Sequence, residues 1–473
     1  LCVGKTNLDQ FATGLVGTRS PFGIPANAYN RAYISGGSSS GSAIAVAAGL
    51  VPFALGTDTA GSGRVPAAFN HLIGYKPSKG RWSTRGLVPA CRTLDCISVF
   101  THDTTNARLV DGVVAGFDPN DPYSRALPER LLEPHRIGVP MPGQRNWFGD
   151  AASQRLYEKA LAVLAERATL IELDIGYLQE AAALLYNGPW VAERTAALRD
   201  LLERDPDAID PTVRKVVEPG AEISAVAAFE GQYRLAALQR EAETMWERVD
   251  MLAFPTTGTI YRIAELLAEP VALNSNLGFY TNFVNLLDMA AVAVPAGQRD
   301  NGTGFGITLI GPAGSDSGLL EAAEDYCTAA GLPATPALDL EGKMETVKLA
   351  VVGAHLKDMP LHWQLTSRHA TFVGSVQTAA TYRLYAMADS TPPKPALVHS
   401  DDGGAIAVEV YELDVGAFGS FVSEVPAPLA IGTVTLEDGS TVKGFVAEPR
   451  ATVGAEDITA LGGWRTYIAR EAE

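Results

Sequence analysis

Apolar residues in the first two thirds of the chain alternate between two spacings. The helical spacing of about 3.6 residues predicts helices over 106–114 and 151–167. The other pattern is a short apolar run bounded by Pro, Gly or charged residues, which predicts a buried strand. Such runs occur at 72–77, 136–140, 170–173, 251–256, 292–295 and 305–310. Helices and strands that alternate along a chain predict an α/β fold built in layers.

The last third of the chain has a different pattern, which begins after a Pro-rich and turn-rich stretch at 331–342. Apolar or alternating runs are separated there by turns such as Asp-Asp-Gly-Gly at 401–404. The runs lie at 347–352, 383–387, 405–413, 432–436 and 441–446. This spacing predicts a small, mostly antiparallel sheet or barrel. We therefore expect a first domain at 1–335, a linker at 336–348 and a second domain at 349–473.

Two Gly/Ser clusters, 36–42 and 57–64, enclose the apolar run 43–55, which we expect to be buried. Glycine lets a backbone approach a ligand closely. Serine supplies a hydroxyl that a neighbouring base can convert into a nucleophile. A flexible linker is the alternative, but a linker rarely encloses a core segment. Asp58 and Arg64 have opposite charges within the second cluster, and we expect them to pair beneath the loop.

The clusters Gly-Gly-Ser-Ser-Ser-Gly-Ser at 36–42 and Gly-Thr-Asp-Thr-Ala-Gly-Ser at 56–62 resemble the amidase signature family. Hydrolases of that family use a Ser–(cis-Ser)–Lys triad. The resemblance implies that Ser62 is the nucleophile and that Ser38, on a cis peptide, is the bridging serine. It also implies a layered α/β/α domain with a mixed sheet. The backbone N–H groups implied to form the oxyanion hole are those of Thr59, Ala60, Gly61 and Ser62.

The resemblance places the triad lysine well upstream of the first Gly/Ser cluster. The chain begins Leu-Cys-Val-Gly-Lys, without methionine, and the context of Lys5 matches a different, structural motif of the family. We therefore expect the chain to be a fragment that lacks the catalytic lysine.

Helical spacing also predicts a helix at the start of 7–30, followed by a loop, and a long helix over 178–202. Tyr186 and Arg194 are eight residues apart, so both would lie on one face of this long helix. Pro189 lies between them and would break or kink it. A guanidinium group beside a tyrosine hydroxyl suits a small carboxylate. The alternative is a surface salt bridge between Arg194 and a nearby acidic side chain, Glu193 or Asp200.

Two further segments, 274–283 and 306–312, resemble the allophanate hydrolase group of the same family, as does the Tyr186/Arg194 pair. That resemblance implies that Tyr186 and Arg194 bind the carboxylate of a small anionic amide, allophanate (N-carbamoylcarbamate). The products would be ammonia and, after decarboxylation, carbon dioxide. In the amidase family, the stretch near Ala12–Gly14 lines the active site, so the backbone there, including Gly14, would accept a hydrogen bond from the substrate. Plain packing of this stretch is the alternative.

The second domain carries Val-Gly-Ala-His-Leu at 352–356 and Ala-Phe-Gly-Ser-Phe at 417–421. Both resemble the C-terminal domain of bacterial allophanate hydrolases, a small α+β barrel-like domain similar to gamma-glutamylcyclotransferase. His355 follows a predicted strand in a turn, a common place for a functional residue. A role in decarboxylating the first product is the functional interpretation of His355; a structural histidine is the alternative.

Composition narrows these possibilities. The net charge of −17 disfavours nucleic-acid and anionic membrane partners. Four scattered cysteines favour free thiols in a reducing, cytoplasmic compartment, and no spacing predicts a metal site. No run is long and apolar enough to predict a membrane span. We expect no cofactor, because Gly-Lys-Met-Glu at 342–345 lacks the methionine that precedes a biotinylated lysine.

We therefore expect a stand-alone hydrolase that acts after a urea carboxylase, and the family implies a homodimer. Three alternatives remain open. One is a general amidase that acts on neutral amides, and another is the glutaminase-type subunit of a tRNA amidotransferase. The third is a non-catalytic scaffold.

Overall fold

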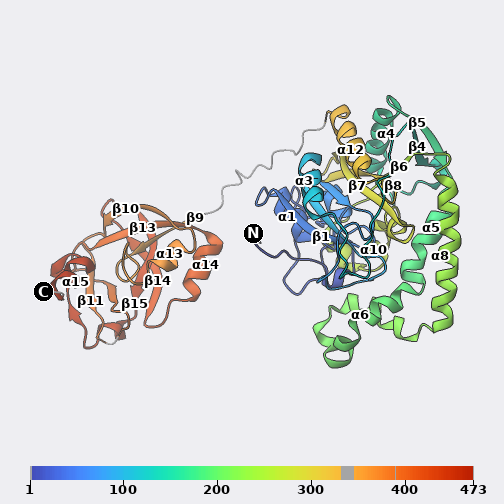
Figure 1. The fold of residues 1–473 in the computed structure, drawn as a ribbon. Coiled ribbons are helices and arrows are strands. Elements are labelled where there is room, and N and C mark those ends of the chain that lie inside the picture. Colours follow the sequence, from blue (N-terminus) through green and yellow to red (C-terminus); the bar gives the residue numbers. More distant parts are fainter. Residues whose placement is uncertain (1–2, 332–345, 389, 472–473) are drawn as a thin grey trace. The chain divides into compact units, whose positions relative to one another are not determined.

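The computed structural model describes residues 3–331, 346–388 and 390–471. The chain divides into two compact units, Leu1–Leu338 and Asp339–Glu473 (Figure 1). Positions 336–345 of the expected linker lie outside the described residues, and so does the tetrapeptide at 342–345 that was compared with a biotin site. The last three residues of that expected linker belong to a strand of the smaller unit, β9 (Thr346–Val351).

The larger unit is built on an eight-stranded mixed sheet in the order β1-β3-β2-β7-β8-β6-β4-β5. Its strand β4 pairs in parallel with both β5 and β6, and the other neighbours pair antiparallel. The strands in chain order are β1 (Phe53–Asp58), β2 (Ile73–Lys76), β3 (Cys96–Thr101), β4 (Arg136–Pro140), β5 (Thr169–Leu173), β6 (Met251–Pro255), β7 (Met289–Gln298) and β8 (Gly304–Pro312). Six of these strands correspond to the six apolar runs, and β4 has the expected bounds.

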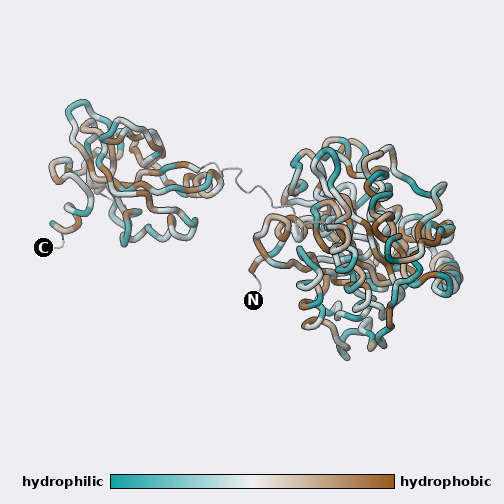
Figure 2. The backbone as a smooth tube through the Cα atoms, turned by 90° about the horizontal axis from the view of Figure 1, so that it is seen from above, coloured by the Kyte–Doolittle hydropathy of each residue, from teal (hydrophilic) through white to brown (hydrophobic). Residues whose placement is uncertain are grey.

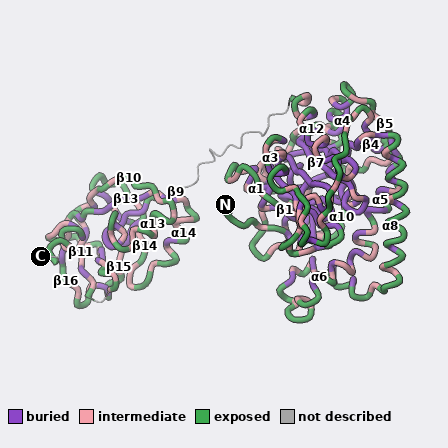
Figure 3. Tube along the Cα trace, in the orientation of Figure 1, coloured by how far each residue is buried: buried purple, intermediate pink, exposed green. Residues whose placement is uncertain are grey.

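Helices cover both faces of this sheet, because strand residues alternate between two cores. On β7, Val292 and Val294 face one core, whereas Met289 and Ala291 face the other. The first core is closed by α3 (Thr104–Val114), α4 (Ala151–Ala165) and α12 (Asp316–Ala329). The second is closed by α5 (Gly176–Asn187), α8 (Ala225–Met245) and α11 (Phe283–Leu286). Figure 3 shows the buried strands between these layers, and the expected layered α/β/α fold is confirmed.

The remaining helices of this unit flank the loops described below. They are α1 (Ser40–Ala47), α2 (Val65–Phe69), α6 (Trp190–Arg204), α7 (Pro211–Val217), α9 (Ile263–Ala268) and α10 (Ala272–Leu277). Figure 2 shows that hydrophobic segments run through the interior of the unit.

Three local expectations for the larger unit are wrong. Only a 3-10 turn, Gln10–Ala12, forms where a helix was expected after residue 7. The expected long helix over 178–202 is two helices, α5 and α6, separated at Gly188 and Pro189. The run 43–55 is only partly buried: α1 contributes to a core, but Phe53 and Leu55 are exposed on β1, which forms an edge of the sheet.

The smaller unit contains a five-stranded sheet in the order β10-β13-β9-β15-β14 and a three-stranded sheet in the order β12-β11-β16. Apart from the parallel pair β15 and β9, neighbouring strands are antiparallel, as expected. The strands after β9 are β10 (Thr371–Gln377), β11 (Tyr382–Ala386), β12 (Pro395–His399), β13 (Ala407–Asp414), β14 (Leu429–Thr435), β15 (Thr441–Ala447) and β16 (Glu456–Asp457). Its helices are α13 (Trp363–Thr366), α14 (Val415–Ser423) and α15 (Trp464–Glu471).

Candidate functional site

The loop that follows β1 is held by the buried carboxylate of Asp58. It accepts hydrogen bonds from the backbone N–H groups of Gly61 at 2.8 Å and Gly63 at 3.1 Å. Both of its oxygens also pair with Arg64, through Nε and Nη2 at 2.9 Å each, and both side chains are fully buried. The expected pairing of Asp58 with Arg64 is confirmed. Ser62 is therefore presented, itself buried, on a loop that charge-assisted bonds make rigid.

This bonding changes the expected oxyanion hole. Because the N–H of Gly61 already donates to Asp58, it is not free to bind a developing oxyanion. The N–H groups of Thr59, Ala60 and Ser62 remain as candidate donors. Position 61 still requires glycine, because its φ is +138° and an added Cβ would lie only 2.6 Å from Oγ1 of Thr281.

Ser38 lies on the other Gly/Ser cluster, and the Gly37–Ser38 peptide bond is cis. Its carbonyl accepts hydrogen bonds from the N–H groups of Asp9 and Ser40, each at 2.9 Å. Its buried hydroxyl has no hydrogen-bond partner among the described residues. A buried hydroxyl without a partner is costly in the free protein, so it fits a group reserved for a proton transfer.

Two contacts bring the Gly/Ser clusters together. Oγ of Ser39 accepts a hydrogen bond from the N–H of Thr57 at 2.9 Å. A Cβ added at Gly36 would lie 2.8 Å from the backbone of Pro66, in the helix that follows Ser62. The two loops that carry Ser38 and Ser62 therefore pack against each other.

Asp9 explains why the expected N-terminal helix does not form. Its buried carboxylate accepts three backbone hydrogen bonds, from Val16 at 3.1 Å, Gly17 at 2.9 Å and Arg19 at 2.9 Å. Side-chain bonds of this kind compete with helical ones. Burial raises the pKa of Asp9, while these N–H groups act in the opposite direction. Gly14 lies inside the loop that Asp9 closes, with a φ of +150°.

Arg194 lies on α6 and is only 1% exposed. Its Nη1 donates to Oγ1 of Thr13 at 3.1 Å, and its guanidinium carbon lies 5.2 Å from the centre of the Tyr186 ring. The other two guanidinium nitrogens, Nε and Nη2, are buried without a hydrogen-bond partner among the described residues. The surface salt bridge considered above is excluded, since the side chain is buried. Tyr186, Arg194 and the loop containing Gly14 are thus brought together, although they lie on separate elements.

Asp95 is an acidic residue that no sequence pattern singled out. It is buried, and its Oδ1 accepts a hydrogen bond from Oγ1 of Thr59 at 2.5 Å. It also accepts hydrogen bonds from the N–H groups of Ala90 at 2.9 Å and Cys91 at 3.1 Å. Burial raises the pKa of Asp95, and the bond from Thr59 acts against that rise. A carboxylate with this many donors fixes the conformation of the residues around it.

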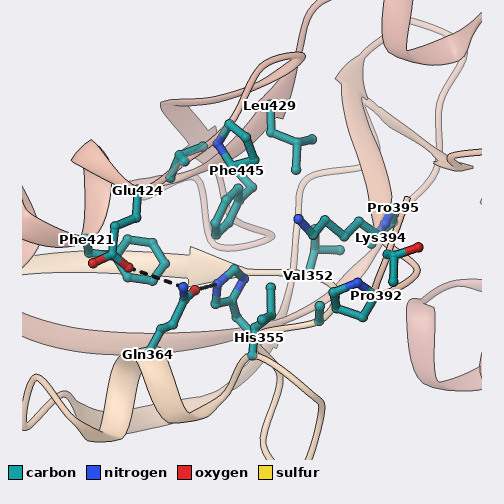
Figure 4. Close-up of a pocket in the computed structure, with 16 residues that line it drawn as sticks. Val352, His355, Gln364, Pro392, Lys394, Pro395, Phe421, Glu424, Leu429 and Phe445 are labelled. Carbon is teal, nitrogen blue, oxygen red and sulfur yellow. Dashed lines mark hydrogen bonds between the residues drawn. The ribbon is translucent and has the colours of Figure 1, made fainter. Parts of the chain in front are cut away.

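The smaller unit contains a separate cavity of about 200 Å³ (Figure 4). His355 lies at its wall, in the turn after β9, and stacks on Phe445 with ring centres 5.0 Å apart. A ring nitrogen of His355 is 2.7 Å from Oε1 of Gln364, whose amide in turn donates to Glu424 at 3.2 Å. Lys394 extends into the same cavity. Burial lowers the pKa of His355, which favours a neutral imidazole near pH 7.

A model of the amidase family matches residues 1–320. The chain belongs to the amidase family. A second model, the allophanate hydrolase C-terminal domain, matches residues 347–469. The chain therefore combines an amidase-family domain with an additional C-terminal domain of a known type.

Among curated proteins, the urea amidolyases of Lachancea kluyveri and Saccharomyces cerevisiae are each 43% identical to the chain over 99% of its length. The chain spans only 27% of the length of these relatives. Among solved structures, the allophanate hydrolase of Kluyveromyces lactis is 43% identical, with a TM-score of 0.68. That match covers 99% of this chain and 81% of the other.

Relatives of another kind match about two thirds of the chain. A glutamyl-tRNA(Gln) amidotransferase from Thermosynechococcus vestitus is 33% identical over 69% of this chain.

Three cysteines, Cys91, Cys96 and Cys327, are free thiols. Within the described ranges, no group of three or more His, Cys, Asp or Glu side chains is placed to hold a metal ion. No helix there is long and apolar enough to cross a membrane.

Proposed function

We propose that this protein hydrolyses allophanate at its terminal amide. The observation that carries the proposal is the state of Arg194, a fully buried cation with two unsatisfied nitrogens beside the ring of Tyr186. A guanidinium group does not lose its proton in a protein, so the charge remains when the site is empty. Two adjacent N–H donors match the two oxygens of a carboxylate. A small substrate that carries both a carboxylate and an amide satisfies this site.

In the proposed reaction, Oγ of Ser62 attacks the amide carbonyl of allophanate and its proton passes to Oγ of Ser38. Ser38 hands its own proton to a base, for which the family resemblance implies a lysine. The oxyanion of the tetrahedral intermediate is held by N–H groups of the 59–62 loop. The C–N bond then breaks and the leaving amine takes up a proton to become ammonia. Water hydrolyses the acyl-enzyme by the reverse relay and releases N-carboxycarbamate.

Arg194 also gives a physical reason for selectivity. A neutral amide would leave the guanidinium buried and unpaired in the complex, whereas the carboxylate of allophanate pairs with it. We therefore expect the protein to prefer allophanate over neutral amides such as propionamide. This separates the proposal from a general amidase, which has no need of a buried cation in its site.

The test is ammonia release by the full-length protein, with allophanate and propionamide as competing substrates. We expect kcat/KM to be larger for allophanate, and Ser62→Ala and Ser38→Ala to abolish the reaction. Labelling of Ser62 by a serine-directed phosphonate would exclude a non-catalytic scaffold. A preference for propionamide would contradict the proposal and favour a general amidase.

We propose a second function for the cavity beside His355, the decarboxylation of N-carboxycarbamate. The cavity supports this, because both His355 and Lys394 line it. Loss of carbon dioxide leaves an electron pair on nitrogen that must be protonated. Because the ring of His355 is neutral near pH 7, Lys394 is the proposed proton donor and His355 the residue that positions the substrate. His355→Ala should keep the first ammonia release while slowing carbon dioxide release. Equal slowing of both products would contradict separate sites.

The remaining assignments are proposals that follow from this reaction. Residues 1–335 would form the amidohydrolase domain and residues 349–473 the C-terminal domain. A urea carboxylase would supply the allophanate, in the cytoplasm, and the protein would be a homodimer. Sedimentation of the purified protein tests the last of these.

A further inference from the structure

Residues 90–95 connect the two halves of the proposed site. At one end, Asp95 holds the hydroxyl of Thr59, in the loop that carries Ser62. In the middle, the N–H and hydroxyl of Thr93 bond the two carboxylate oxygens of Glu193, at 2.9 and 2.7 Å. Glu193 is the neighbour of Arg194 on α6. We refer to residues 90–95 as the clasp.

Two further bonds reinforce the clasp. The thiol of Cys91 lies 3.7 Å from the carbonyl of Trp190, in the first turn of α6. The amide of Asn285 donates both to the carbonyl of Asp58, at 2.6 Å, and to that of Leu94, at 2.9 Å. The clasp is therefore tied on one side to the nucleophile loop and on the other to the helix that carries the free guanidinium group.

The electrostatics agree with this placement. Asp95 and Glu193 are the acidic side chains whose charges act on Arg194, and Arg194 acts in return on Asp95. Neither carboxylate is bonded to the guanidinium group, because Asp95 is occupied by Thr59 and the clasp backbone, and Glu193 by Thr93. The clasp thus keeps both acids close to Arg194 while leaving its two nitrogens free.

We propose that the clasp sets the distance between the oxyanion-binding loop and Arg194, and so the length of the anionic substrate that fits. The positioning residues are Asp95, in the clasp, and Glu193, which the clasp residue Thr93 binds. This inference rests on the proposed function, in which the amide reacts at Ser62 while the carboxylate binds Arg194. An acid with one additional methylene between its two ends would be out of register with one of these two points. Discrimination of a single methylene is worth about 10- to 200-fold in a rigid site.

Binding of two dicarboxylates tests the clasp without relying on turnover. Malonate has the chain length of allophanate, and succinate is one methylene longer. We expect titration calorimetry of the full-length protein to show at least about tenfold tighter binding of malonate. Glu193→Ala should reduce this preference several-fold, since the released clasp allows the two halves to move apart. Asp200→Ala is the matched control, because Asp200 is exposed on the same helix, and it should keep the wild-type preference.

Thr59→Val provides a second variant. It removes the hydrogen bond between Thr59 and Asp95, at the other end of the clasp from Glu193. We expect it to lower the malonate preference as Glu193→Ala does.

The outcomes separate the two proposals. If the wild type prefers malonate and both Glu193→Ala and Thr59→Val keep that preference, the clasp proposal is wrong and the proposed function stands. If the wild type binds neither dicarboxylate, or binds both equally, the clasp proposal fails. If the wild type binds neither dicarboxylate, the proposed carboxylate-binding role of Arg194 fails as well.

Discussion

Replacing Arg194 with methionine should remove most activity toward allophanate and at the same time stabilise the fold. Methionine is unbranched and apolar, so it can occupy the same buried space without a charge. The variant loses two charge-assisted bonds to the substrate carboxylate, each worth about 1.5–3 kcal/mol. Together they correspond to a decrease in kcat/KM of about 10²- to 10⁴-fold.

The stabilisation follows from the unpaired state of the guanidinium group. Taking an ion out of water costs several kcal/mol, and Arg194 recovers only part of this. The charges of Asp95 and Glu193 favour the cation, and two direct contacts add to this: its bond to Thr13 and its contact with Tyr186. Those two contacts are worth about 1–2 kcal/mol each. Their loss cancels most of the gain, so we expect the free energy of unfolding to rise by about 1 kcal/mol.

Arg64→Met is the matched control, since Arg64 is equally buried but paired through two bonds with Asp58. Removing it leaves that carboxylate without its cation, which should lower the free energy of unfolding by about 3–5 kcal/mol. Urea unfolding of the wild type and both variants measures the difference, alongside kcat/KM for allophanate. The argument is refuted if Arg194→Met destabilises the protein as much as Arg64→Met does, or if its kcat/KM is unchanged.

Three other predictions concern pH, thiol chemistry and backbone packing. Burial lowers the pKa of His71 from 6.5 to about 4, so between these values the unfolded chain binds a proton that the folded protein does not. Stability should therefore fall by about 2 kcal/mol from pH 7 to pH 5, and His71→Asn, which suits the local φ of 53°, should abolish this part of the loss in urea titrations. Burial raises the pKa of Cys91 to about 12, so iodoacetamide at pH 8 should label it only in urea; mass spectrometry showing labelling of the folded protein would contradict this. Gly37→Ala should lower the free energy of unfolding by about 1–3 kcal/mol, because the added Cβ would overlap Oδ2 of Asp9. Gly112→Ala should raise it by up to about 1 kcal/mol, because Gly112 lies inside α3 with open space around it. Equal urea midpoints for the two variants would contradict this prediction.

Five of the six inner strands could be predicted from the sequence because they are buried on both faces, whereas the sixth, β3, was not among the predicted runs. A strand such as β4 or β7 is then a continuous apolar run with turn residues at its ends. Strand β1 differs because it forms an edge of the sheet, where Phe53 and Leu55 are exposed to solvent. The alanine-rich run before it therefore indicated more burial than the fold provides.

Acidic residues account for most of what could not be predicted. Asp9 lies among apolar residues at helical spacing, but its carboxylate captures N–H groups seven to ten residues ahead and closes a loop instead. Asp95 and Glu193 act on partners 36 and 100 residues away in the chain. No local pattern encodes such contacts, whereas the Gly/Ser clusters were recognisable because their residues are contiguous.

Two of the buried arginines, Arg64 and Arg194, show how, under the proposed function, an acidic chain would be selective for an acidic substrate. With a net charge of −17, the surface does not attract a small anion. Arg64 uses its charge within the fold, where it fixes the loop of Ser62 through Asp58. In the proposed function, Arg194 would pair with the substrate, because Asp95 and Glu193 are both bonded elsewhere although their charges reach it. Selectivity would then depend on keeping Arg194 unpaired inside the protein. Thr59, which bonds Asp95, and Thr93, which bonds Glu193, would be as necessary for this selectivity as the guanidinium group itself.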